Sequence, residues 1–151
     1  MNEKPTVLLV DDSKNDLFLT RAAFARAEFK NPLQAVRNGD EAIAYLKGEG
    51  PYHDREKFPL PAVMLLDLNM PMKSGFEVLK WVGEQNGLKR LSIIVLSAST
   101  RPEDVEQAFE LGANSFLVKP GTVIELTAMI RCLRDWLQYN HFPPLNHAVH
   151  R

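Results

Sequence analysis

Cysteine is almost absent from this chain. Cys132 is the only one among 151 residues, so no disulfide can form within the chain. This excludes the disulfide-stapled folds of small secreted proteins, and it fits a reducing compartment. The length is sufficient for one domain with a hydrophobic core and too short for two ordinary domains.

Long hydrophobic runs and an excess of one charge are also missing. No apolar stretch approaches the roughly 20 residues that span a bilayer, and residues 1–5 lack the apolar segment of a signal peptide. The formal net charge of −1 gives no general electrostatic attraction to nucleic acid or to an anionic membrane surface. These absences predict a cytoplasmic protein with no nucleic-acid partner and no membrane partner.

The chain does contain a strict alternation of short apolar runs and amphipathic segments. The apolar runs, which we expect to be strands, are 6–10, 33–36, 62–66, 92–96 and 115–118. The segments with apolar residues at helical spacing are 14–28, 41–47, 75–86, 102–112 and 122–139. This alternation predicts an α/β fold, a doubly wound parallel sheet with helices on both faces. The flavodoxin-like (βα)5 strand order 2-1-3-4-5 would place the first and third strands side by side.

Carboxylates follow these two strands at the point where each one ends. Asp67 comes directly after the run 62–66, and Asp11 and Asp12 follow the run 6–10. Ligands of open α/β sheets collect at the carboxyl ends of the strands, so we expect the three side chains to lie together. Their mutual repulsion predicts a divalent metal ion among them, with an anionic group beside it.

Two further polar residues follow strands at the same predicted edge. Ser97 ends the fourth strand and Lys119 ends the fifth. The set lacks a histidine or another evident group for proton transfer, so it fits hydrolysis poorly. It suits transfer of a phosphoryl group onto a carboxylate, where positioning and charge neutralisation dominate.

At this point the sequence closely resembles the receiver domain of bacterial two-component response regulators, over about residues 5–139. The shared signature consists of separated elements in a fixed order. They are Asp11-Asp12, Asp67, Pro71 with Gly75, Ser97-Ala98 and Lys119-Pro120. Each element alone is weak evidence, whereas all of them at the ends of the right strands are specific.

The resemblance implies a role for each acid. Asp67 would accept a phosphoryl group from a phosphohistidine on a sensor histidine kinase. Asp12 and Asp67 would bind Mg²⁺ directly, together with the backbone carbonyl of Asn69, and Asp11 would act mainly through a metal-bound water. Oxygen ligands and retained waters are what Mg²⁺ prefers.

The resemblance also assigns the remaining site residues. Ser97 and Lys119 would contact oxygens of the phosphoryl group, and Lys119 would pair with Asp67 before phosphorylation. The peptide bond between Lys119 and Pro120 would be cis, which would aim the lysine. Phe116 matches the switch aromatic of the family, with a plain core phenylalanine as the alternative.

The segment after residue 139 is too short for an output domain. We therefore expect a stand-alone receiver (5–139) with a tail (140–151) that signals by self-association or by binding a partner. In the family, the surface for this is the fourth helix, fifth strand and fifth helix. The Pro-containing stretch 49–61 and the tail are similar to those of a subgroup of stand-alone receivers. Members of this subgroup are often paired with phytochrome-type sensor kinases, and some form homodimers. The alternative for the stretch 49–61 is a solvated surface loop.

Other functions stay open beside that of a non-enzymatic phosphoacceptor. One is a phosphorelay intermediate that passes the group to a histidine phosphotransfer protein. Another is an enzyme of the haloacid dehalogenase type, although its general acid would be an Asp where this chain has Asn69. A third is a pseudo-receiver scaffold, against which the complete set Asp12, Asp67, Ser97 and Lys119 argues.

Overall fold

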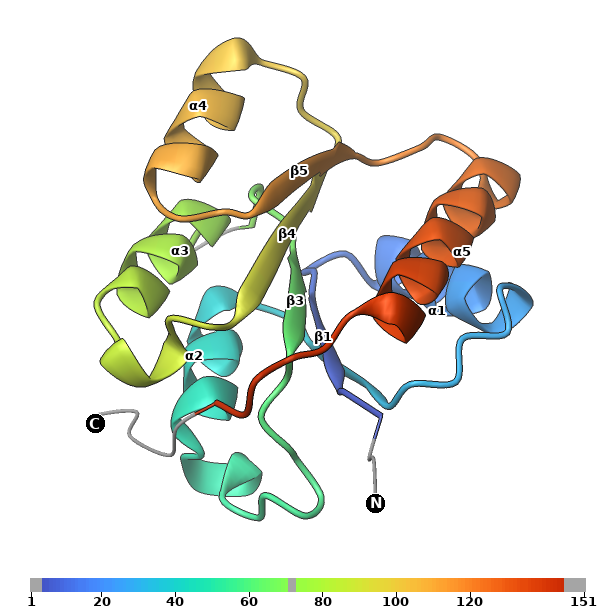
Figure 1. The fold of residues 1–151 in the computed structure, drawn as a ribbon. Coiled ribbons are helices and arrows are strands. Elements are labelled where there is room, and N and C mark those ends of the chain that lie inside the picture. The colour runs from blue at the N-terminus through green and yellow to red at the C-terminus, as the bar shows by residue number, and fades with distance from the viewer. Residues whose placement is uncertain (1–3, 71–72, 146–151) are drawn as a thin grey trace.

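Five short strands lie in a row and all run in the same direction. The computed structural model describes residues 4–70 and 73–145. The strands are β1 (Val7–Val10), β2 (Leu33–Val36), β3 (Val63–Leu66), β4 (Ser92–Ser97) and β5 (Ser115–Val118). Their order is β2-β1-β3-β4-β5, and every neighbouring pair is parallel. The predicted flavodoxin-like α/β fold and its strand order are therefore confirmed (Figure 1).

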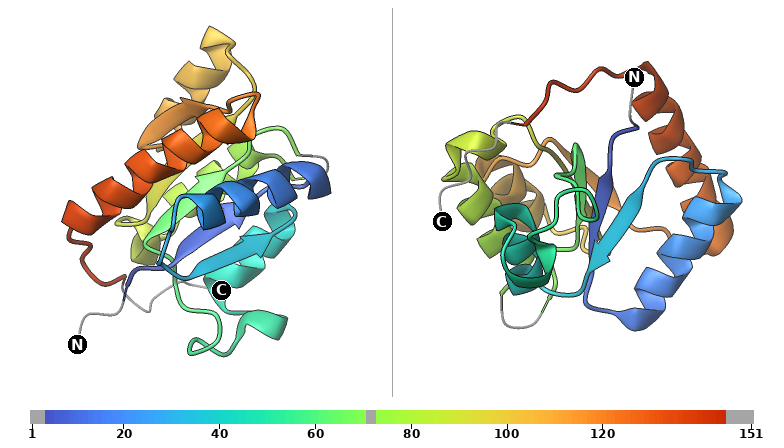
Figure 2. Two further views of the ribbon diagram at one scale, coloured as in Figure 1. Left: turned by 90° about the vertical axis from the view of Figure 1, so that its right-hand side faces the viewer. Right: turned by 90° about the horizontal axis from the view of Figure 1, so that it is seen from below.

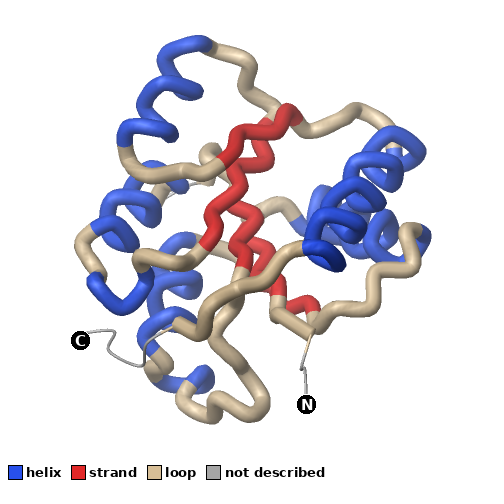
Figure 3. The backbone as a smooth tube through the Cα atoms, viewed as in Figure 1, coloured by secondary structure: helices blue, strands red, loops and turns tan. Residues whose placement is uncertain are grey.

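Helices cover both faces of this sheet. They are α1 (Lys14–Arg26), α2 (Gly39–Lys47), α3 (Gly75–Gly83), α4 (Pro102–Glu110) and α5 (Val123–Tyr139), with short 3-10 turns η1 (Gly50–Tyr52) and η2 (Asn86–Leu88). Figures 1 and 2 show α1 and α5 together on one face and α2, α3 and α4 on the other. The backbone tube in Figure 3 shows the strands enclosed between these two helical layers.

The two faces of β1 supply two separate cores. Leu8 and Val10 belong to the cluster on the side of α2 and α3, whereas Val7 and Leu9 pack with residues of α1 and α5. Successive side chains of a strand point to opposite faces, which explains this division. All four residues of β1 are buried, as expected for a central strand covered on both sides.

Polar caps fix where the helices begin. Ser13, Asn38, Ser74 and Thr122 each accept a hydrogen bond from the backbone amide of the third helical residue of α1, α2, α3 and α5, respectively. Asn38 therefore starts α2 at Gly39, earlier than the apolar pattern of 41–47 indicates. Because these four helices follow β1, β2, β3 and β5, the caps lie in the loops at the carboxyl ends of those strands.

The loop before β3 is a surface segment, but it is anchored. Tyr45, Tyr52 and Phe58 form a cluster of aromatic rings with centroids 5.1–6.0 Å apart. The Tyr45 hydroxyl donates to the Pro59 carbonyl at 2.7 Å, and the Arg55 guanidinium donates to carbonyls at the end of α2. Most residues of the loop are exposed or half-buried, as expected for a solvated surface loop. The contacts above nevertheless attach it to α2.

The described part of the tail runs past the amino ends of the strands without regular secondary structure. Phe142 packs edge-on against Trp136 at 5.6 Å and contacts the α1–α5 core. Leu145 contacts the core on the opposite face, so residues 140–145 connect the two helical layers (Figure 1). Residues 146–151 lie outside the described part. None of the described helices combines the length and apolar character needed to cross a membrane.

Candidate functional site at the carboxyl edge of the sheet

Carboxylates gather where β1 and β3 end. The two strands are paired with Val10 opposite Leu66, so Asp11 and Asp67 follow at neighbouring positions. The Asp67 amide donates to the Val10 carbonyl at 3.0 Å, which extends the pairing by one residue. One oxygen from each of Asp11, Asp12 and Asp67 lies within 4.8 Å of the others. The structure thus brings together the acids that the sequence predicted to meet.

Asp67 is a buried carboxyl, with 9% of its surface exposed. Burial raises the pKa of its carboxyl from 3.8 to about 6, and the neighbouring charges of Asp11 and Asp12 add to the rise. The Lys119 ammonium and the backbone amide of Asn69, which donates to Asp67 Oδ1 at 3.2 Å, act in the opposite direction. An ionised Asp67 is therefore under electrostatic stress that a nearby cation would relieve.

The donor set fits a divalent cation. Asp11, Asp12 and Asp67 offer carboxylate oxygens alone, and hard cations such as Mg²⁺, Mn²⁺ and Ca²⁺ take oxygen ligands. Asp12 is half-buried, whereas Asp11 and Asp67 are buried, so an ion held by the three would still reach solvent for its water ligands.

Lys119 reaches these acids from the end of β5. Its Nζ lies 3.0 Å from Asp11 Oδ2 and 3.3 Å from Asp16 Oδ2. Burial acts to lower the pKa of this ammonium, but the hydrogen bond to Asp11 and the charges of Asp11, Asp67 and Asp16 outweigh it and raise the pKa. The expected ion pair with Asp67 is not formed in this structure, because the two other carboxylates hold the ammonium. Its charge still acts on the pKa of Asp67.

Asp16 is the site residue that sequence reasoning missed. It is the third residue of α1, and an acid in the first turn of a helix is ordinary because it complements the helix dipole. The available signal was the start of α1 immediately after the Asp11-Asp12 pair.

Ser97 closes the side of the site formed by β4. It is fully buried, and its hydroxyl accepts a hydrogen bond from the Ser99 amide at 3.1 Å. Its carbonyl accepts from the Lys119 amide at 2.8 Å, which fixes the two strand ends together. The structure therefore places Ser97 and Lys119 at one edge, as predicted.

The expected cis bond before Pro120 is wrong for this structure. No cis peptide bond occurs among the described residues, so Lys119 and Pro120 are joined in trans. The trans isomer is favoured by about 0.5–1 kcal/mol for a bond to proline, and in this geometry the ammonium already reaches Asp11. The backbone carbonyl of Asn69 remains an expected metal ligand, on an exposed residue next to the acids.

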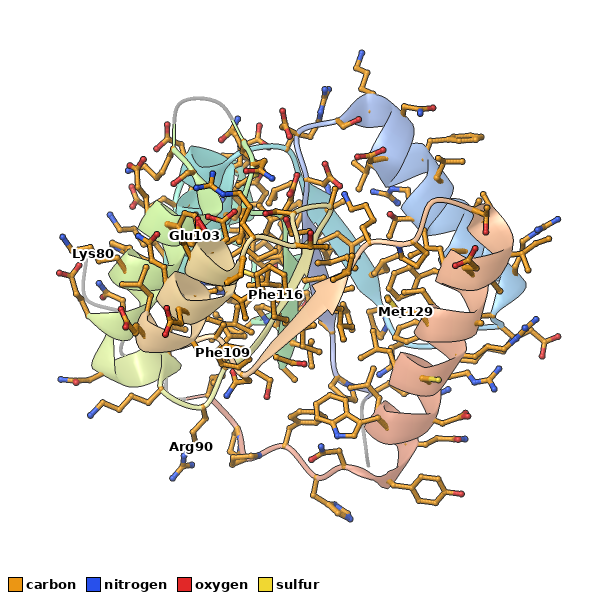
Figure 4. The ribbon with its side chains drawn as sticks, turned by 90° about the horizontal axis from the view of Figure 1, so that it is seen from above. Lys80, Arg90, Glu103, Phe109, Phe116 and Met129 are labelled. Atoms are coloured by element: carbon orange, nitrogen blue, oxygen red, sulfur yellow. The ribbon has the colours of Figure 1, made fainter. Side chains whose placement is uncertain are left out.

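Phe116 lies on β5, partly buried against the core on the α3–α4 side. Viewed from above in Figure 4, it lies on the side of α3 and α4, with Phe109 of α4 nearby, while Met129 of α5 lies across the sheet. The Phe116 side chain thus packs the strand that precedes Lys119 against the layer that contains α4. This position suits a switch aromatic, and it equally suits a core phenylalanine.

Gly75 fits against the acceptor loop because it has no side chain. A Cβ there would lie 2.5 Å from the Asp67 carbonyl oxygen and 2.7 Å from the Leu68 Cα. Gly75 also donates its amide to the Leu68 carbonyl at 3.1 Å, so α3 begins in direct contact with the loop after β3. Pro71, the other signature residue of this loop, lies outside the described residues.

The space enclosed beneath the acids is small. A cavity of about 10 Å³ lies among residues that include Asp11, Thr20 and Asp67, and such a volume holds about one water molecule.

Residues 7–131 match the family described as response regulator receiver domain. Response regulator Rcp1 of Synechocystis sp. is 35% identical to the chain over 138 residues, which are 91% of this chain and 92% of Rcp1. The crystal structure of the Mn²⁺-bound form of Rcp1 is similar with a TM-score of 0.81 at 34% identity, covering 93% of this chain and 99% of that one.

Two other solved structures are similar at 33% sequence identity, and in each case the alignment covers 93% of this chain and 99% of the other chain. One is the phosphorylated cyanobacterial phytochrome response regulator RcpA, with a TM-score of 0.83. The other is response regulator RPA3017 in red light signaling of R. palustris, with a TM-score of 0.86. These likenesses extend over nearly the whole chain, so they include the strand ends that carry the site.

Proposed function

The chain belongs to the response regulator receiver domain family of two-component systems, and from this premise we propose that Asp67 accepts a phosphoryl group from a sensor histidine kinase. One observation carries the proposal: three carboxylates and an ammonium meet where β1, β3 and β5 end. In the transfer, a carboxylate oxygen of Asp67 forms a bond to phosphorus while the bond from phosphorus to the kinase histidine breaks. The imidazole leaves with the electron pair of that bond.

The other residues would position and neutralise the group. The Ser97 hydroxyl and the Lys119 ammonium would contact phosphoryl oxygens, where charge stabilisation does most of the work. Asp12 and Asp67, with the Asn69 carbonyl, would hold Mg²⁺ directly, and Asp11 would hold it through water. The bound ion would neutralise the negative charge of the phosphoryl group and of the acids. The Mn²⁺-bound form of Rcp1 supports a divalent ion of this kind.

The finer biological role is also part of the proposal. A receiver at residues 5–139 followed by the tail 140–151 would act in the cytoplasm, where a kinase has access to ATP. The relatives named for phytochrome and red light signalling support a phytochrome-type kinase as the partner. The surface of α4, β5 and α5 would then bind a partner protein or a second copy of the chain, with Phe116 as the switch aromatic.

The family favours a phosphoacceptor over a haloacid dehalogenase-type enzyme. Position 69, where such an enzyme would carry its general acid, is an asparagine whose backbone amide donates a hydrogen bond to Asp67 Oδ1. The chemistry proposed for the chain is therefore limited to its own phosphorylation and dephosphorylation.

Intact mass spectrometry after incubation with acetyl phosphate would test the acceptor. We expect one phosphoryl adduct on the wild type in Mg²⁺, and none on Asp67→Asn or in EDTA. Asp135→Asn is a matched control, because Asp135 is exposed on α5 and pairs with Arg134 away from the site. An adduct on Asp67→Asn would refute the assignment. Absence of an adduct on every variant would be followed by the same assay with a phosphorylated histidine kinase, and failure there would identify a pseudo-receiver.

A further inference from the structure

Asp16 is a fourth acid at the site, and it meets the site through Lys119. Its carboxylate lies 3.3 Å from the Lys119 Nζ, and the side chain is 41% exposed. It is not one of the three acids whose oxygens lie close enough together to share a metal ion in the described part of the chain. Any effect of Asp16 on the acceptor should therefore pass through the ammonium.

The local hydrogen bonds explain why this carboxylate is available. The Asp16 amide donates to the Ser13 hydroxyl at 3.2 Å, which is the ordinary cap of a helix start. An acid at this third helical position often accepts a return bond from the amide of the capping residue. Here the Ser13 amide donates to Asp11 Oδ1 at 3.0 Å instead. Asp11 thus takes the place that Asp16 would have filled, and the Asp16 carboxylate contacts Lys119.

Lys119 has one ammonium group for several anionic partners. Its side chain is 12% exposed and contacts both Asp11, which follows β1 directly, and Asp16, in the first turn of α1. A phosphoryl group on Asp67 needs the same ammonium. The contacts with Asp11 and Asp16 use two of the three donors of the ammonium, so these acids would compete with a phosphoryl group for its hydrogen bonds and its charge.

We propose that Asp16 is a positioning residue for Lys119, which holds the ammonium on the Asp11 side of the site and competes for it with a phosphoryl group on Asp67. The inference rests on the proposed function, because the competitor is the phosphorylated acceptor. Asp16 would thereby disfavour the phosphorylated form of the protein and oppose the conformational change that phosphorylation of Asp67 favours.

Affinity for beryllium trifluoride, a non-covalent mimic of the phosphoryl group, measures this competition directly. An ion pair with this degree of exposure supports a roughly two- to five-fold change in affinity. We therefore expect Asp16→Asn to bind beryllium trifluoride more tightly by that factor in saturating Mg²⁺, measured by calorimetric titration. Asp16→Glu keeps the carboxylate and should restore the wild-type affinity.

Glu125→Gln is the matched control for the helix start. Glu125 is the third residue of α5, and its amide donates to the Thr122 hydroxyl at 3.2 Å, as the Asp16 amide does to Ser13. The substitution removes an acid from a capped first turn but leaves the ion pairs of Lys119 in place. Its affinity for beryllium trifluoride should equal that of the wild type.

A double-mutant cycle with Lys119→Ala separates positioning from other effects. Without the ammonium, Asp16→Asn should no longer change the affinity. A second readout needs neither metal nor phosphoryl mimic: the NMR signal of the Lys119 side-chain εCH₂ in EDTA should move in Asp16→Asn and stay in place in Glu125→Gln.

The outcomes distinguish this inference from the proposed function. Unchanged affinity in Asp16→Asn, with normal binding by the wild type, would overturn the role of Asp16 alone. If Asp16→Asn still increased the affinity for beryllium trifluoride in the Lys119→Ala background, the proposed role of Asp16 would also be overturned, because the effect would not pass through the ammonium. If the wild type neither bound the mimic nor accepted a phosphoryl group from acetyl phosphate or a kinase, both proposals would fall.

Discussion

Replacing Asp67 by Asn is expected to make the metal-free protein more stable at neutral pH. Asp67 is 9% exposed, and burial together with the charges of Asp11 and Asp12 raises its pKa from 3.8 to about 6. A rise of about two units, at about 1.4 kcal/mol per unit, corresponds to a destabilisation on the order of 3 kcal/mol when the carboxylate is ionised in the folded state. Asparagine has nearly the same shape and no charge, so the variant lacks this destabilisation.

The difference between the two proteins should depend on pH in a defined way. Below pH 3.8 the Asp67 carboxyl is protonated in both the folded and the unfolded chain, and it gives no difference. Between pH 3.8 and about 6 the unfolded chain releases this proton while the folded chain retains it. Wild-type stability therefore falls relative to the variant as the pH rises through this window, and the full difference is present above it.

Urea unfolding in EDTA at a series of pH values would measure this effect, with thermal unfolding as a second assay. At pH 7.5 we expect the melting temperature of Asp67→Asn to exceed that of the wild type by roughly 6–12 °C for a chain of this size. Added Mg²⁺ should narrow the gap, because it stabilises the folded wild type that binds it. Equal stability at pH 7.5, or a gap that does not change with pH, would refute the reasoning.

Three further substitutions test other parts of the site and its support. Gly75→Ala would put a Cβ 2.5 Å from a backbone carbonyl oxygen, so its free energy of unfolding in urea should be lower than that of the wild type by about 1–3 kcal/mol. Gly121→Ala is the control: a Cβ there has nothing within 4 Å, and its stability should not fall. Tyr45→Phe removes the hydrogen bond to the Pro59 carbonyl, so a loss of about 1 kcal/mol and faster proteolysis within the loop before β3 are expected, and unchanged proteolysis would count against the anchor. Asp12→Asn should weaken Mg²⁺ binding at least tenfold in a calorimetric titration while the protein stays folded, and wild-type affinity would remove Asp12 from the metal site.

Much of this site could be predicted because its residues follow the strands directly. A buried parallel strand reads as an apolar run, and the first polar residue after it marks the edge where ligands collect. Asp11, Asp67, Ser97 and Lys119 all stand at such points. Once the strand order is known, their meeting at one edge follows from parallel pairing, however far apart they lie in the sequence.

The missed features depend on side-chain choices that an apolar pattern does not encode. Several carboxylates lie within reach of Lys119, and only the three-dimensional arrangement shows that its ammonium contacts Asp11 and Asp16. The isomer of the bond before Pro120 depends on a small free-energy difference, so the residue types alone do not decide it. The anchor of the loop before β3 rests on ring contacts between Tyr45 and residues well beyond its own helix.

The two hydrophobic cores of the fold do not include the acids at this edge. Both hydrophobic cores are complete without them, since the clusters on the two faces of the sheet consist of apolar residues. The raised pKa of Asp67 means that its ionised form works against folding in the absence of a neutralising group. Such a carboxylate is stabilised when a cation binds beside it, and it loses its own negative charge when its oxygen bonds to phosphorus in an acyl phosphate. The electrostatic stress at Asp67 therefore links the stability of this edge to the ligation and phosphorylation state that the protein is proposed to report.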